Sequence, residues 1–99
     1  MKRSNKIRKF ELNRYSIITN DLEHCFLCGK RKEHLHEVIF GKNRVNSMKY
    51  GLVIPVCLHC HDLIHNNIKL DNELKVKAQL CFEEHYDLDF LSIFHKNYI

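Results

Sequence analysis

The sequence predicts a small α+β domain that is stabilised by a bound metal ion. Three observations predict it: two Cys-x-x-Cys pairs, two short apolar runs typical of strands, and one long stretch of helical periodicity. A chain of 99 residues buries only about 60–65% of its unfolded surface, so a metal ion would add needed stability. Three Gly and one Pro are too few for a many-turned β sandwich.

The composition narrows the class of protein. Hydrophobic residues make up 44% of the chain, with six Phe and four Tyr, which indicates a folded core. No run of about 18 apolar residues is present, so we expect no membrane span. The basic N-terminus lacks the apolar stretch of a secretory signal, which favours the cytoplasm. The net charge of +4 favours an acidic partner such as nucleic acid.

Residues 1–20 are expected to form a basic arm ahead of the domain proper at 21–99. The first fourteen residues hold a single acid and six basic residues: Lys2, Arg3, Lys6, Arg8, Lys9 and Arg14. Such an arm can lie along a phosphate backbone, with Arg8 and Lys9 as contacts, or it can be a solvated, frayed terminus. Residues 15–18 are expected to form a short strand or turn that docks the arm.

Two short strands and a polar connection come next. Residues 35–40 form the first strand, which carries His36. Residues 41–51 form a basic, polar connection with Gly at both ends. Residues 52–56 form a second, β-branched strand, in which Pro55 indicates an edge or an early end.

Helices account for the C-terminal half. Residues 57–66 are expected to turn into a helix, and residues 70–86 show the clearest helical spacing, with Asp71 as the N-cap. Asp87 or Asp89 is expected to cap a last short helix whose Phe side chains cover the core.

The two Cys-x-x-Cys pairs match the ligands of a tetrahedral four-thiolate zinc site. Cys25 and Cys28 lie on a tight turn, and 28 residues separate them from Cys57 and Cys60, which leaves room for both strands. The alternative is that some of these side chains are small core hydrophobes. Cys81 falls inside a helical pattern and is interpreted as a core residue.

His61 and His65 predict a second metal site. They are spaced i,i+4, so they share one face of the helix and can bind one cation together. A third ligand has to come from elsewhere, and His36 and Glu37 on the first strand are the best candidates. The alternative is that one of the helix histidines replaces a Cys at the zinc, or only caps the helix.

Three motifs follow one another along the chain: Cys25-x2-Cys28, Leu35-His36-Glu37-Val38 and Cys57-x2-Cys60-His61-x3-His65. In this order they resemble the HNH endonucleases of the ββα-metal (His-Me finger) group. Segments 40–44, 49–52 and 94–99 also look like the small zinc-stapled forms common in bacteriophages and mobile elements. The resemblance covers residues 25–99.

The resemblance implies a treble-clef-like core in which a β hairpin and a helix clasp one divalent ion against the nucleic-acid backbone. A strand His acts on a water that attacks phosphorus in line, and the products carry 5′-phosphate and 3′-hydroxyl ends. His36, His61 and His65 would hold the ion. Mg²⁺ or Mn²⁺ is expected there, with Zn²⁺ and Ni²⁺ as alternatives.

Two alignments with the family assign the roles on the first strand differently. Matching Val38 to the family's aliphatic residue makes His36 a metal ligand and Glu37 the general base, although a carboxylate with a pKa near 4 is a weak base at neutral pH. A shift by one residue makes His36 the base and leaves the metal to His61, His65 and Glu37. His36 is essential in both alignments.

The family's middle Asn has no counterpart just before the second Cys pair. Asn43 or Asn46 in the connection could orient the base from a different position, or both could be ordinary turn residues. Arg44, with Lys42 and Lys49 nearby, is expected to clamp a phosphate, or these residues form a solvated basic loop.

The sequence therefore favours a metal-dependent HNH-type endonuclease that nicks DNA, for which double-strand cutting would require a dimer. The first alternative is a zinc-finger module of the same fold that binds nucleic acid but has lost cleavage, as the Glu at position 37 and the missing Asn would suggest. The second is a protein that engages another protein through its Phe-rich C-terminal region.

Overall fold

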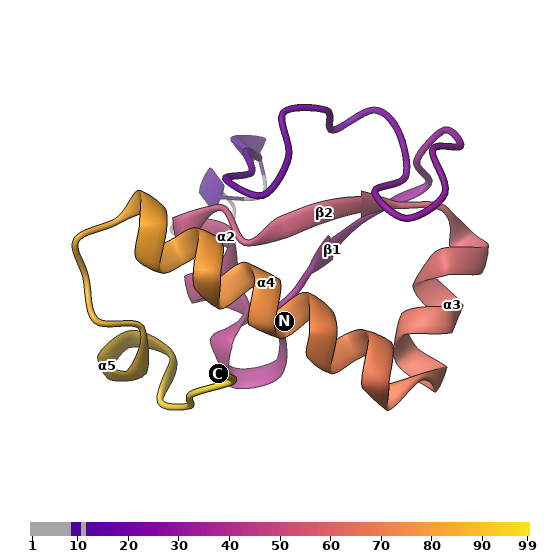
Figure 1. The fold of residues 1–99 in the computed structure, drawn as a ribbon. Helices are drawn as coiled ribbons and strands as arrows, with labels where there is room; N and C mark the ends of the chain where they lie inside the picture. Colours follow the sequence, from indigo (N-terminus) through magenta and orange to yellow (C-terminus); the bar gives the residue numbers. More distant parts are fainter. Residues whose placement is uncertain (1–8, 11) are drawn as a thin grey trace, which may run out of the picture.

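A computed structural model describes residues 9, 10 and 12–99, and in these residues a two-stranded sheet is surrounded by helices (Figure 1). The elements in chain order are β1 (His34–Glu37), η1 (Gly41–Asn43), α2 (Arg44–Tyr50), β2 (Val53–Val56), α3 (Leu58–Asn66), α4 (Ile68–His85) and α5 (Phe90–Phe94). The radius of gyration is 13.2 Å, as expected for a compact chain of this length. The predicted α+β class is confirmed.

The strands β1 and β2 pair antiparallel, from His34 opposite Val56 to Glu37 opposite Val53. Both predicted strands are present but shorter than predicted, because β1 ends at Glu37 where the chain begins to turn towards η1. All four residues of β2 are buried, whereas His36 is the buried residue of β1. The sheet thus carries one imidazole inward.

The basic, polar connection at 41–51, for which no helix was predicted, is helical over most of its length. The 3-10 helix η1 leads into α2, which buries Ser47 and Met48. The Ser47 hydroxyl donates to the carbonyl of Ile39, which ties α2 to the end of β1. Gly51 ends α2 with φ of 73°, a left-handed conformation that favours glycine. A polar composition concealed this helix because only one short turn of it packs inward.

The long helix α4 begins earlier than predicted. The side chain of Asn67 accepts a hydrogen bond from the Leu70 N–H at 3.1 Å and so forms the N-cap. The predicted cap at Asp71 is therefore wrong: Asp71 lies in the first turn, where its carboxylate is 2.7 Å from the Lys75 ammonium. The first residue, Ile68, is apolar but 80% exposed, so it does not continue the buried face of α4. The spacing of the buried residues therefore did not indicate where the helix starts.

The short helix α5 follows Asp89, one of the two predicted caps. Its carboxylate makes no capping bond to the backbone and accepts instead from the Ser92 hydroxyl at 2.5 Å. The rings of Phe82, Phe90 and Phe94 are buried together, with Phe90 stacked on Phe94 at 4.5 Å between centroids. Each such ring contributes about 1.5–3 kcal/mol by burial. The phenylalanines of the C-terminal region are therefore core residues, which argues against a docking surface made from them.

The segment 15–18 docks on the sheet as a turn, one of the two predicted forms. The Ser16 hydroxyl donates to the Val53 carbonyl at 2.7 Å and accepts from the Ile18 N–H at 3.0 Å. Ile17 and Ile18 pack against the core. Arg8, predicted to contact nucleic acid, lies outside the described residues. Among the described residues, no helix has the length and apolar character needed to cross a membrane.

Candidate metal centres

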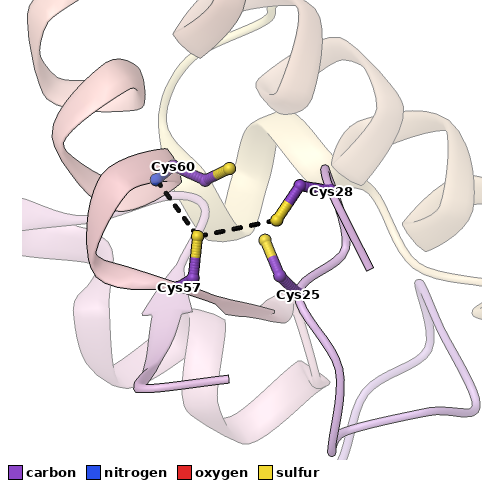
Figure 2. A group of neighbouring side chains, drawn as sticks. All are labelled: Cys25, Cys28, Cys57 and Cys60. Carbon is purple, nitrogen blue, oxygen red and sulfur yellow. Dashed lines mark hydrogen bonds between the residues drawn. The ribbon is translucent and has the colours of Figure 1, made fainter. Parts of the chain in front are cut away.

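Four thiols meet where the turn at 25–28 faces the start of α3, and Figure 2 shows them pointing toward one another. The sulfurs of Cys25, Cys28, Cys57 and Cys60 all lie within 4.8 Å of one another, and Cys28 and Cys57 are 3.6 Å apart. Zn–S bonds of about 2.3 Å in a tetrahedral site place sulfurs about 3.8 Å apart, whereas a disulfide needs about 2.05 Å. The cluster fits a zinc ion held by four thiolates.

The backbone places these thiols with specific contacts. Gly29 adopts a φ of 80°, and its N–H donates to the Cys25 carbonyl at 2.9 Å, which closes the turn. The Phe26 N–H donates to the Pro55 carbonyl at 2.8 Å and anchors the turn on β2. Cys57 follows β2 directly and is the N-cap of α3, since its sulfur accepts from the Cys60 N–H at 3.4 Å.

The backbone amides also tune the thiols. Although burial opposes ionisation, hydrogen bonds from the N–H groups of Cys57, Cys28 and Leu27 lower the pKa of Cys25 to about 6. Burial, followed by hydrogen bonds with the neighbouring thiols, raises the pKa of Cys60. One thiolate therefore forms readily, and full ionisation of the set requires the positive charge of a bound cation.

Three imidazoles form a second cluster across β1 and α3. His36, His61 and His65 each offer a ring nitrogen within 4.8 Å of the others, and the Nε2 atoms of His61 and His65 are 3.0 Å apart. Two nitrogens bound to one cation at about 2.1 Å and at right angles would also lie about 3.0 Å apart. The structure brings together the three histidines that the sequence placed at the second site.

His36 is the buried member of this cluster. The residue is 4% exposed, and its Nε2 is buried without a hydrogen-bond partner. Burial, followed by the neighbouring His61 and His65, lowers the pKa of His36 to about 4, so the ring is neutral at neutral pH. A buried nitrogen of a neutral imidazole that accepts no hydrogen bond is suited to bind a cation.

Glu37, adjacent to His36 on β1, points to the opposite face of the strand. Its Oε1 is 2.6 Å from Nη2 of Arg14, and its Oε2 is 3.9 Å from Nε of Arg44. The Arg14 and Glu37 side chains are only 19% and 13% exposed. The carboxylate thus lies against guanidinium groups and not within the imidazole cluster, and its role as base or ligand stays a prediction.

The two asparagines of the connection contact α5. The side-chain amide of Asn43 donates to the Phe94 carbonyl at 2.9 Å, and that of Asn46 donates to the Ile93 carbonyl at 3.1 Å. Both amides therefore hold α2 against α5 in this structure. The predicted role of Asn43 in orienting a base is not supported by these contacts and stays a prediction.

The basic residues expected to bind phosphate lie on η1, α2 and the N-terminal segment. Lys42 and Lys49 are exposed, and Lys49 Nζ lies 5.2 Å from the centroid of the Tyr50 ring. Arg44, at the start of α2, is the one that reaches toward β1, through Glu37. Lys9 is exposed, and its carbonyl accepts from the Asn13 N–H at 3.1 Å.

Sequence reasoning missed several residues beside the imidazole cluster, among them Phe40 and Asp71. The ring of Phe40 lies 5.8 Å from that of His65 and 6.0 Å from that of His36. Asp71 faces the same region from α4, although its sequence context suggested only a cap. No local pattern indicates either one, because the end of β1 and the start of α4 meet only in the folded chain.

Comparison of the chain with models of protein families, with curated proteins and with solved structures finds no match. The function is therefore inferred from the residues and their geometry.

Proposed function

We propose that this protein is a metal-dependent endonuclease of the HNH type that nicks DNA, with β1, β2 and α3 as its ββα-metal core. The observation that carries the proposal is the convergence of His36 from β1 with His61 and His65 from α3. A buried imidazole nitrogen without a partner, set beside two further imidazoles, is costly unless a cation binds it.

The two clusters suit different tasks. Four thiols, three of them buried, make a closed site typical of structural zinc. Three imidazoles leave coordination positions for water and substrate, as catalytic sites do. A divalent cation held there supplies polarisation of a phosphate oxygen and stabilisation of the leaving oxygen.

The position of His36 fits the alignment in which it is a metal ligand, because its buried nitrogen is neutral and lies within the imidazole cluster. That alignment makes Glu37 the base. Its carboxylate would have to leave Arg14 and turn from the opposite face of β1 to receive the proton of the attacking water. Lys42, Arg44 and Lys49 hold the DNA backbone on the side of η1 and α2.

Nicking of supercoiled plasmid tests the proposal. We expect relaxation that needs added Mg²⁺ or Mn²⁺, and a loss of at least about 100-fold in His36→Ala. His59→Ala is the control, because His59 is exposed on α3, the helix of His61 and His65, and lies outside the cluster. Equal rates in both variants, or no nicking with Mg²⁺, Mn²⁺, Zn²⁺ or Ni²⁺, would contradict the proposal.

Glu37→Gln separates the two alignments. If Glu37 is the base, this variant loses nicking while its affinity for the second cation stays unchanged. If the variant loses affinity for the second cation together with nicking, Glu37 is a ligand and His36 is the better choice of base.

A second function is a DNA-binding module without cleavage. The contacts of Glu37 with Arg14 and of Asn43 with α5 favour it, because neither side chain contacts the imidazole cluster. Salt-dependent DNA binding without nicking, with any of the four metals, would select this function.

A further inference from the structure

A cavity of about 380 Å³ opens beside the imidazole cluster, where the end of α3 meets the start of α4. Its lining residues are Phe40, Ile64, His65, Asn66, Ile68 and Asp71. The volume is that of a small-molecule site. His65 belongs to both the cavity wall and the imidazole cluster, so anything bound in the cavity would lie next to a cation held by the histidines.

Asp71 lines this cavity and carries a buried acceptor atom without a partner. Its Oδ2 is 2.7 Å from the Lys75 ammonium, but its Oδ1 is buried and has no hydrogen-bond partner. Buried carboxylate oxygens are normally hydrogen-bonded, because an unmade bond to a charged group is costly. The vacant acceptor calls for a ligand that donates an N–H or O–H.

The remaining walls favour a flat ligand. Phe40 is 42% exposed, and the Lys75 ammonium lies 4.5 Å from the centroid of its ring. Ile64 and Ile68 add apolar surface on the α3 and α4 sides. An aromatic ring, apolar walls and one strong acceptor together match a nucleobase, which stacks by its face and donates from its edge.

We propose that the cavity binds an unpaired base of the DNA strand that is cut, stacked against Phe40 and donating an amine or ring N–H to Oδ1 of Asp71. This inference rests on the proposed function and names its substrate class. A base that donates its Watson–Crick edge to Asp71 cannot be paired at the same time. The preferred substrate is therefore DNA with an unpaired or displaced nucleotide, rather than a fully paired duplex.

Binding of DNA that contains one 2-aminopurine tests the cavity independently of cleavage. The probe is placed as a single-base bulge or in a fully paired duplex of the same sequence, with no divalent cation added so that the DNA stays intact. We expect the fluorescence of the bulged probe to change on binding, because its base exchanges the neighbouring bases for Phe40. The paired probe should show weaker binding and no such change.

Two variants locate the site. Asp71→Asn keeps the size of the side chain but weakens the acceptor, and Phe40→Leu keeps the apolar wall but removes the aromatic face. Each should weaken binding of the bulged probe about tenfold. Glu73→Gln is the matched control. It removes the same charge from an exposed residue of the same helix that lies outside this cavity. Thermal unfolding of each variant verifies the fold.

The outcomes separate this inference from the nuclease itself. Nicking of plasmid without any change in probe fluorescence, or a change that survives both variants, overturns the cavity as a base site but leaves the proposed function standing. No binding of either DNA overturns both. A fluorescence change with free 2-aminopurine nucleotide but not with the bulged DNA would make the cavity a nucleotide site and overturn the proposed substrate.

Discussion

The thiol cluster and the imidazole cluster are built from adjoining parts of the chain but differ in almost every physical respect. Both use α3, which begins directly after Cys57 and carries His61 and His65 one and two turns further on. The thiol cluster offers four ligands, and backbone N–H groups donate hydrogen bonds to its Cys25. The imidazole cluster offers three ligands, and Nε2 of His36 has no hydrogen-bond partner.

In the proposed function, this difference lets a chain of 99 residues combine a stabilising metal site with an open one. A closed four-ligand site contributes to folding, because its ligands come together only in the folded state. An open three-ligand site contributes little to folding and leaves room for a substrate. Placing both on one short helix lets the first hold the second in position.

The largest expected effect comes from breaking the thiol cluster. Cys57→Ser removes a zinc ligand, while the serine hydroxyl can still cap α3. We therefore expect loss of zinc and an unfolded chain, because structural zinc contributes more than the whole stability of a small domain. Circular dichroism and zinc content measure it. Cys81→Ser, which removes the one thiol outside the cluster, should remain folded with zinc bound. A folded Cys57→Ser protein that keeps its zinc would refute the role of this cluster.

A smaller effect is expected from protonation of the imidazole cluster. The pKa of His36 is about 4 in the folded chain against 6.5 ordinarily. The unfolded chain therefore binds more protons between these values, and stability present above pH 6.5 falls as the pH drops towards 4, by about 3 kcal/mol in total. Urea unfolding of wild type and His36→Gln across this range, without added divalent cation, measures the difference. If the free energies of unfolding of the two proteins depend on pH in the same way, protonation of His36 does not cause the loss of stability.

The two candidate metal clusters could be predicted from the sequence because the spacing of their residues is local. A Cys-x-x-Cys turn and an i,i+4 pair of His are set by a few neighbouring residues, and the structure brings both sets together. The helix α2 was missed, although Gly51 offered a signal for a helix end. Only one turn of α2 is buried, so polar residues dominate the sequence pattern of the helix.

The surroundings of the clusters could not be predicted, because they depend on contacts between distant segments. Arg14 meets Glu37 across 23 positions of the chain, and Asn43 meets Phe94 across 51. Asp71 resembled a helix cap in the sequence, and its place in the wall of a cavity follows only from the packing of α3 against α4. Residue types and spacing can indicate which ions a chain binds, but the neighbours that tune them come from the fold.

The most direct test of the two-cluster account is a titration of zinc-loaded protein with Mn²⁺ or Ni²⁺, comparing wild type with His65→Ala by calorimetry. We predict one added cation per wild-type chain, an affinity at least about tenfold lower in the variant, and an unchanged zinc content in both. An equal affinity in the two proteins, or loss of zinc from His65→Ala, would contradict the assignment of separate closed and open metal centres.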